Sequence, residues 1–152
     1  MQQSHHRIQQ LRQLLSGVSR FQYVSEPGPA SVMGWAGEGR GAVRVEAETD
    51  LLLFHESGHF YPQQGNEIAM FNCFEWGISE RGMRLSHRRR GEAVFLFDLV
   101  PDENSGSWVS EQPHLCGDDI YQGRLDITAT GIALSWRVTG PRKDENFNYH
   151  YC

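Results

Sequence analysis

The chain has 152 residues, of which 39% are hydrophobic and 22% charged, and its formal net charge at pH 7 is −5. This predicts a single globular domain over residues 1–152, and the acidic balance argues against nucleic acid and anionic membranes as partners. The sequence has no apolar run of bilayer length, no signal-peptide pattern and no CxxC pair among its three cysteines, so we expect a cytoplasmic protein.

The first element that the sequence predicts is a short amphipathic helix over residues 4–16. Ile8, Leu11 and Leu15 recur at helical spacing with polar residues between them, and Gly17 marks the end of the pattern. We expect this helix to cover one end of the structure that follows.

After residue 17 the hydrophobic period changes to two, which is typical of β-strands. The expected strands are 18–26, 32–35, 41–48, 51–61, 67–79, 83–88, 93–100, 114–128, 132–139 and 146–151. Turns rich in Gly and Pro separate most of them, and residues 101–112 are expected to form a polar loop. The pattern predicts a mainly β fold, an antiparallel up-and-down β-barrel of about eight to ten strands, with a β-sandwich as the alternative.

The densest group of reactive side chains lies at the start of the long strand expected near the C-terminus. In a regular strand His114 and Cys116 would share one face and Asp119 and Tyr121 the other, unless Gly117 forms a bulge that resets the phase. Two interpretations stay open. Either His114 is an acid or base that Asp119 orients in a cavity, or Asp119 and Tyr121 hold the strand entry by hydrogen bonds to the backbone.

A metal site is a further alternative for the same group, because His, Cys and Asp all bind metals. The spacing matches no ligand motif, and additional ligands would have to come from His55, His59 or His87. In a strand, His55 and His59 would be about 13 Å apart, too far to share one ion. We therefore expect no metal and no cofactor.

Glu56 is a candidate buried carboxylate. It shares a strand face with Phe54, so if Phe54 lies in the core then Glu56 lies there too and needs a partner. Arg44, Arg84 or Lys143 could provide the positive charge.

Lys143 is the only lysine in the chain and follows a Gly-Pro turn. It either pairs with Asp144 or Glu145 in water or binds an anionic ligand group at the barrel mouth. The arginine-rich residues 81–90 are expected to form a charged hairpin turn rather than a nucleic-acid patch, because the chain is acidic and no aromatic platform accompanies them.

Two extended motifs stand in the last forty residues. They are His114-x-Cys116-x-x-Asp119-x-Tyr121-x-Gly123 and Trp136-x-Val138-x-Gly140-Pro141-x-Lys143-Asp144, with a closing Tyr149, and Phe54-x-Glu56-x-Gly58 stands upstream. With these motifs the chain resembles a bacterial and fungal domain-of-unknown-function family of lipocalin-like, or calycin-like, β-barrels over nearly its whole length. The resemblance implies a barrel with a cavity and no agreed activity. The chain departs from the family's Phe-Asp-Gly-Arg-x-Phe-His hairpin, because it has Phe97-Asp98 where that Phe-His pair is expected.

These observations lead us to expect a small, partly apolar ligand inside the barrel, with aromatic walls. The expected ligand-binding residues are Arg84, His87, Cys116, Trp136, Lys143, Tyr149 and Glu56, together with His114, Asp119 and Tyr121. The alternative is a cofactor-free acid–base enzyme, an isomerase, cyclase or hydrolase of a natural-product-like substrate. In that enzyme His114 would be the acid or base, Asp119 its orienter, and Tyr121 or Lys143 the stabiliser of negative charge. A structural partner role that uses the helix, and a homodimer, are further alternatives.

Overall fold

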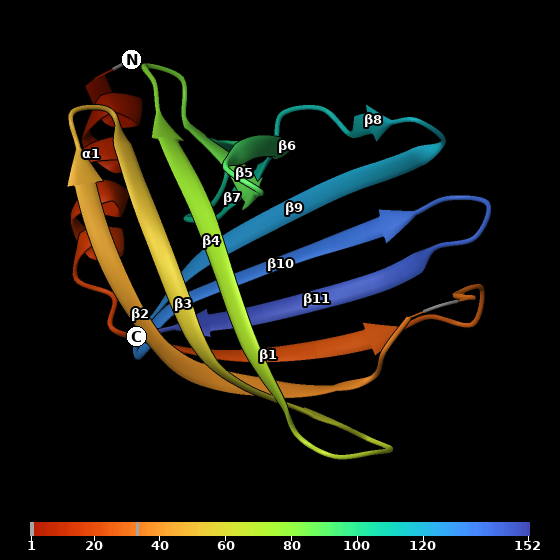
Figure 1. Ribbon diagram of the computed structural model, residues 1–152. Helices are drawn as coiled ribbons and strands as arrows, with labels where there is room; N and C mark the ends of the chain where they lie inside the picture. The colour runs from red at the N-terminus through yellow and green to blue at the C-terminus, as the bar shows by residue number, and fades with distance from the viewer. Residues whose placement is uncertain (1, 33) are drawn as a thin grey trace.

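The computed structural model describes residues 2–32 and 34–152. One N-terminal helix precedes a series of antiparallel strands (Figure 1). The elements are α1 (Gln2–Ser16), β1 (Arg20–Pro27), β2 (Gly37–Glu48), β3 (Leu51–Pro62), β4 (Ile68–Ile78), β5 (Met83–Arg89), β6 (Glu92–Pro101), β7 (Trp108–Ser110), β8 (His114–Cys116), β9 (Asp119–Thr128), β10 (Gly131–Thr139) and β11 (Asp144–Tyr151).

The strands close into a ring. The sheet runs in the order β10-β11-β1-β2-β3-β4-β5-β6-β7-β9, and β9 pairs again with β10. The short strand β8 pairs with β9 alone and stays outside the ring. The predicted fold class is therefore confirmed as a closed ten-strand antiparallel barrel with one N-terminal helix.

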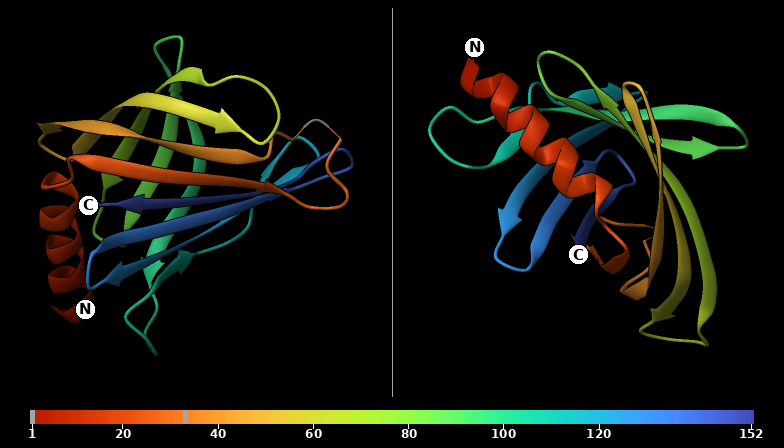
Figure 2. Two further views of the ribbon diagram at one scale, coloured as in Figure 1. Left: turned by 90° about the horizontal axis from the view of Figure 1, so that it is seen from below. Right: turned by 90° about the vertical axis from the view of Figure 1, so that its left-hand side faces the viewer.

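Helix α1 lies across one end of the barrel (Figure 2). Its apolar stripe of Ile8, Leu11 and Leu15 is buried in the barrel core, while Leu14 on the outer side is 40% exposed. The Arg7 side chain fastens the helix to the loop before β7 by donating to the carbonyl oxygens of Asp102, at 2.7 Å, and Ser107, at 3.0 Å. This end of the barrel is thereby closed.

The half of the barrel next to α1 is filled by inward side chains. Alternate residues of each strand point inside, and in this half they are large and apolar, such as Trp76 on β4, Phe97 on β6 and Trp108 on β7. Residue 123 on β9 has no room for a side chain larger than that of glycine, because the Phe97 ring occupies the position that a Cβ atom would take. The filled half therefore acts as the floor for the opposite, open half.

Three local predictions were wrong. The strand expected over residues 114–128 is the hairpin of β8 and β9, because Gly117 adopts a left-handed φ of 62° in the turn between them. The expected loop 101–112 contains β7, which pairs with β6 and β9. Residues 32, 34 and 35 form no strand, and residue 33 of that expected strand lies outside the described residues.

Candidate functional site

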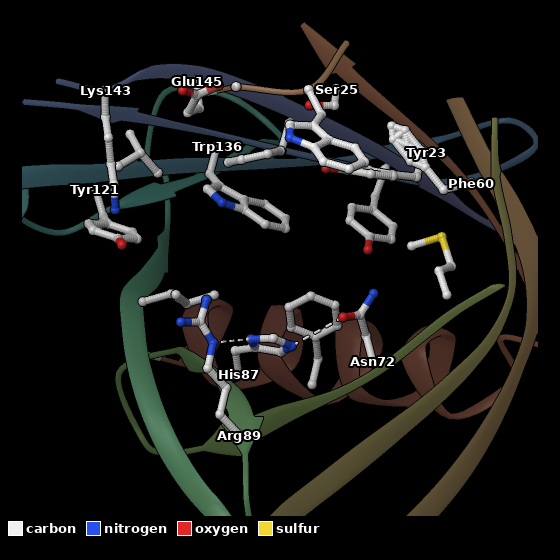
Figure 3. Close-up of a pocket in the computed structure, with 18 of the residues that line it drawn as sticks. Tyr23, Ser25, Phe60, Asn72, His87, Arg89, Tyr121, Trp136, Lys143 and Glu145 are labelled. Atoms are coloured by element: carbon white, nitrogen blue, oxygen red, sulfur yellow. Dashed lines mark hydrogen bonds between the residues drawn. The ribbon is translucent and has the colours of Figure 1, made fainter. Parts of the chain in front are cut away.

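A hollow of about 800 Å³ occupies the open half of the barrel (Figure 3). Its walls come from inward residues of eight strands and from the loops at the end opposite α1. The lining residues are Tyr23, Ser25, Gly34, Trp35, Phe60, Met70, Asn72, Phe74, His87, Arg89, Leu96, Tyr121, Trp136, Val138, Arg142, Lys143, Glu145, Phe147 and Tyr149. We call this space the cavity.

One wall of the cavity is a sheet of aromatic rings. Trp136 on β10 stacks on Tyr149 of β11 at a centroid distance of 5.6 Å and an interplanar angle of 9°. Tyr149 in turn lies 4.8 Å from Tyr23 on β1, and Phe147 lies 5.3 Å from Trp136. Because β1, β10 and β11 are neighbours and these residues alternate along them, the period-two pattern itself assembles the wall.

The opposite wall carries a polar group built on His87 (Figure 3). The Arg89 Nε donates to His87 Nδ1 at 3.0 Å, so the proton of the neutral ring is on Nε2, which donates to Asn72 Oδ1 at 3.2 Å. Burial lowers the pKa of His87, and the charge of Arg89 lowers it further. His87 therefore stays neutral at pH 7 with a fixed tautomer.

The mouth of the cavity is rich in positive charge. Lys143 Nζ lies 3.2 Å from Asp119 Oδ2, and this hydrogen bond raises the pKa of the lysine. Arg142 stands beside it and makes no ion pair within the described part of the chain. Glu145, the one carboxylate among the described residues that line the cavity, accepts a hydrogen bond from Ser31 Oγ at 2.5 Å.

Glu56 lies deep in the barrel and is only 2% exposed. Its Oε2 accepts a hydrogen bond from the Tyr151 hydroxyl at 2.6 Å, and its Oε1 has no hydrogen-bond partner among the described residues. Burial raises the pKa of Glu56 to about 7, against the opposing effect of the Tyr151 and Tyr149 hydroxyls. The prediction of a buried Glu56 is thus confirmed, but a tyrosine rather than Arg44, Arg84 or Lys143 is its partner.

In the barrel wall beside Glu56, part of β4 makes no backbone hydrogen bonds to β5 and meets it through side chains. Backbone pairing between β4 and β5 covers only Phe74–Ile78 and Met83–His87, and the lower part of β4 runs away from β5 (Figure 1). We call this unpaired stretch, between residues 68–73 and 88–89, the seam. The His87–Asn72 hydrogen bond spans it.

A second hollow of about 870 Å³, the side hollow, opens at the seam. Glu56 lines it, and so do Arg44, Arg88 and Arg90. Asn72, His87 and Arg89 line both the side hollow and the cavity. Only side chains therefore separate the two spaces.

The other residues that the sequence predicts for the site fall into two groups, those that line the cavity and those that lie outside it. His87, Tyr121, Trp136, Lys143 and Tyr149 line the cavity. They come from four strands and one turn, which the ring closure brings together.

The remaining expected residues lie elsewhere. His114 packs on Phe95 outside the cavity, with ring centroids 4.3 Å apart, and Asp119 pairs with Lys143 rather than with His114. Cys116 is exposed on β8. Arg84 faces outward and makes two hydrogen bonds to Asp98. No catalytic role is tested by these positions, and the His114 role stays a prediction.

Among the residues that contact His87 or Glu56, three were not predicted from the sequence. Asn72 and Arg89 carry no local motif, and Tyr151 is 95 residues from Glu56 in the chain. The alternation of residues along the strands of β4, β5 and β11 gives their inward direction, but pairing Tyr151 with Glu56 requires the ring closure.

Within residues 2–32 and 34–152, no group of three or more His, Cys, Asp or Glu side chains is placed to hold a metal ion. The single helix of the described chain is too short and too polar to cross a membrane.

Comparison with known proteins gives a family and no activity. The model of a family of unknown function, DUF6314, matches residues 29–152. No curated protein and no solved structure matches the chain. The match covers most of the barrel, from the loop after β1 to the last residue of the chain. The chain therefore belongs to the DUF6314 family.

Proposed function

We propose that this barrel binds one small, partly apolar molecule with a flat ring system inside the cavity. The observation that carries the proposal is the hollow of about 800 Å³ with one aromatic wall and a few convergent polar groups. Ligand sites in proteins typically have about 300–1,000 Å³ and this mixed lining. The closed floor and the open mouth give such a molecule one way in.

The lining also supports a position for the ligand. The stacked rings of Trp136 and Tyr149 suit the face of a flat apolar group. At the mouth, Lys143 and Arg142 attract an anionic molecule toward the cavity. A flat ring that carries an acidic group satisfies both the aromatic wall and this positive charge.

Acid–base catalysis is the second candidate. The observation that favours it is that His87 and Glu56, two proton-exchanging side chains, both border the side hollow. A host metabolite extract incubated with the protein separates the two functions, because an enzyme converts one compound into another and a binding protein changes none.

Native mass spectrometry of protein purified gently from its host tests the binding proposal. The wild type is expected to carry a small organic molecule. Val138→Trp places an indole in the cavity and is expected to lose that molecule. Ile120→Trp, on the face of β9 opposite to that of Tyr121 and 39% exposed, is the matched control and should keep it. Melting temperatures show whether both variants fold. Equal retention by all three proteins contradicts a site in the cavity.

A further inference from the structure

Two buried side-chain atoms have no hydrogen-bond partner among the described residues, Trp76 Nε1 and Glu56 Oε1, and Glu56 is the titratable one. The described groups that face Glu56 or lie against it are Tyr149 and Tyr151 on β11, Tyr23 on β1, Asn72 and Cys73 on β4, and His87 on β5. None of them carries a positive charge at pH 7, because His87 is neutral there. A buried carboxylate without a cation is costly, so the acid form is favoured.

The hydrogen bond from Tyr151 fixes where the proton sits in that acid form. In the arrangement that the structure shows, Oε2 accepts from the Tyr151 hydroxyl at 2.6 Å and so acts as the carbonyl oxygen of the acid form. The proton is then on Oε1, which has no partner among the described residues. The acid form thus holds a buried O–H donor that makes no hydrogen bond with the described residues, and such a group is costly.

The charges around Glu56 favour a negative ligand rather than a positive one. Arg89, Arg142 and Lys143 line the cavity, against one carboxylate, that of Glu145. The side hollow adds further arginines but only Glu56 itself as an acid. These cations attract an anion, and an anion beside Glu56 strengthens its hold on a proton.

We propose that Glu56, in its acid form, donates a hydrogen bond through Oε1 to an anionic oxygen of an aromatic acid bound in the barrel. The inference rests on the proposed function and adds the substrate class, an aromatic carboxylate or phenolate. The ligand reaches Oε1 beside Asn72, which lies directly opposite Glu56 on β4 and lines the cavity. Where Glu56 is ionised in the free protein, binding takes up one proton from solvent and breaks no covalent bond.

Isothermal titration calorimetry with 2-naphthoate tests the proposal, because buffers with different ionisation enthalpies report the protons taken up. Glu56 has a pKa of about 7, so the wild type should take up about half a proton at pH 7. The affinity should fall about fifteenfold between pH 7 and pH 8.5, as the acid form is lost. Of the groups facing Glu56, none other titrates in this range, because the pKa of His87 is lowered and the pKa values of Tyr23, Tyr149, Tyr151 and Cys73 are raised.

Glu56→Gln is the decisive variant. Its amide oxygen can accept from Tyr151 and its N–H can donate to the ligand, so it imitates the acid form at every pH. It should bind 2-naphthoate with no proton uptake and with an affinity that does not change from pH 7 to pH 8.5. Glu38→Gln, on the exposed face of β2, is the control and should keep the wild-type pH dependence.

A second variant covers the case in which Glu56→Gln does not fold. Tyr151→Phe removes a hydroxyl that lowers the pKa of Glu56, so the pH at which affinity falls should move upward. A wild type that binds 2-naphthoate with no proton uptake overturns the inference and leaves the proposed function intact. An unchanged pH profile in either variant also overturns it. Failure of the proposed function shows separately, as equal ligand retention by Val138→Trp and the wild type.

Discussion

Replacing Glu56 by Gln should make the folded protein markedly more stable above pH 7. Burial raises the pKa of this carboxyl from the ordinary value of 4.5 to about 7. An acid with a raised pKa holds a proton in the folded chain that the unfolded chain has released, so its contribution to stability is lost as pH rises from about 4.5 to 7. At about 1.4 kcal/mol per pH unit, this loss is about 3 kcal/mol. The glutamine side chain of the variant cannot ionise, so the variant escapes this loss.

Urea unfolding at pH 5 and pH 8 measures this difference. The free energy of unfolding of the wild type, compared with that of Glu56→Gln, should be lower by about 3 kcal/mol at pH 8 and by less than about 1 kcal/mol at pH 5. The comparison of two variants at the same pH cancels the titration of every other group. A difference that does not change between the two pH values would show that Glu56 is not buried beside Tyr151 as described.

Three further substitutions test the fold and the mouth. Leu11→Ala in α1 should lower the free energy of unfolding by about 2–5 kcal/mol because the side chain is fully buried, whereas Leu14→Ala should change it little. Equal effects of the two substitutions in urea unfolding would contradict the packing of this face of α1 on the barrel. Gly123→Ala should lower the melting temperature, because the new methyl group meets the Phe97 ring, and an unchanged melting temperature would contradict that contact. Lys143→Met should change the free energy of unfolding by less than about 1 kcal/mol, since the ion pair of Lys143 is exposed. It should nevertheless weaken the binding of 2-naphthoate in calorimetry, and an unchanged affinity would show that Lys143 does not contribute to the site.

The fold was predictable because its main elements follow simple periodicities. The helical spacing of Ile8, Leu11 and Leu15 places α1 correctly, and the change to a period of two after residue 17 predicts most of the strands. Glu56 could be assigned to the interior from Phe54 alone, because the two share one strand face. The aromatic wall followed from the same alternation.

The rest depended on contacts between distant parts of the chain. Gly117 was predicted to lie within one long strand, either as a regular strand residue or as a bulge. In the structure its left-handed backbone forms the turn between β8 and β9, and His114 lies outside the cavity. The seam arises where pairing between two strands stops, and strand lengths alone do not give that point. The Tyr151 hydroxyl reaches Glu56 only because the last strand closes beside the first.

The most direct test of the cavity as a binding site is an amide and indole NMR titration with 2-naphthoate. Saturable shifts are expected at the Trp136 indole N–H and at the backbone of Tyr121, Val138 and Phe147, which line the cavity, with small changes along α1. Shifts confined to the outer faces of the strands or to α1, or no saturable shift in any residue, would contradict the proposal that this barrel binds its ligand inside.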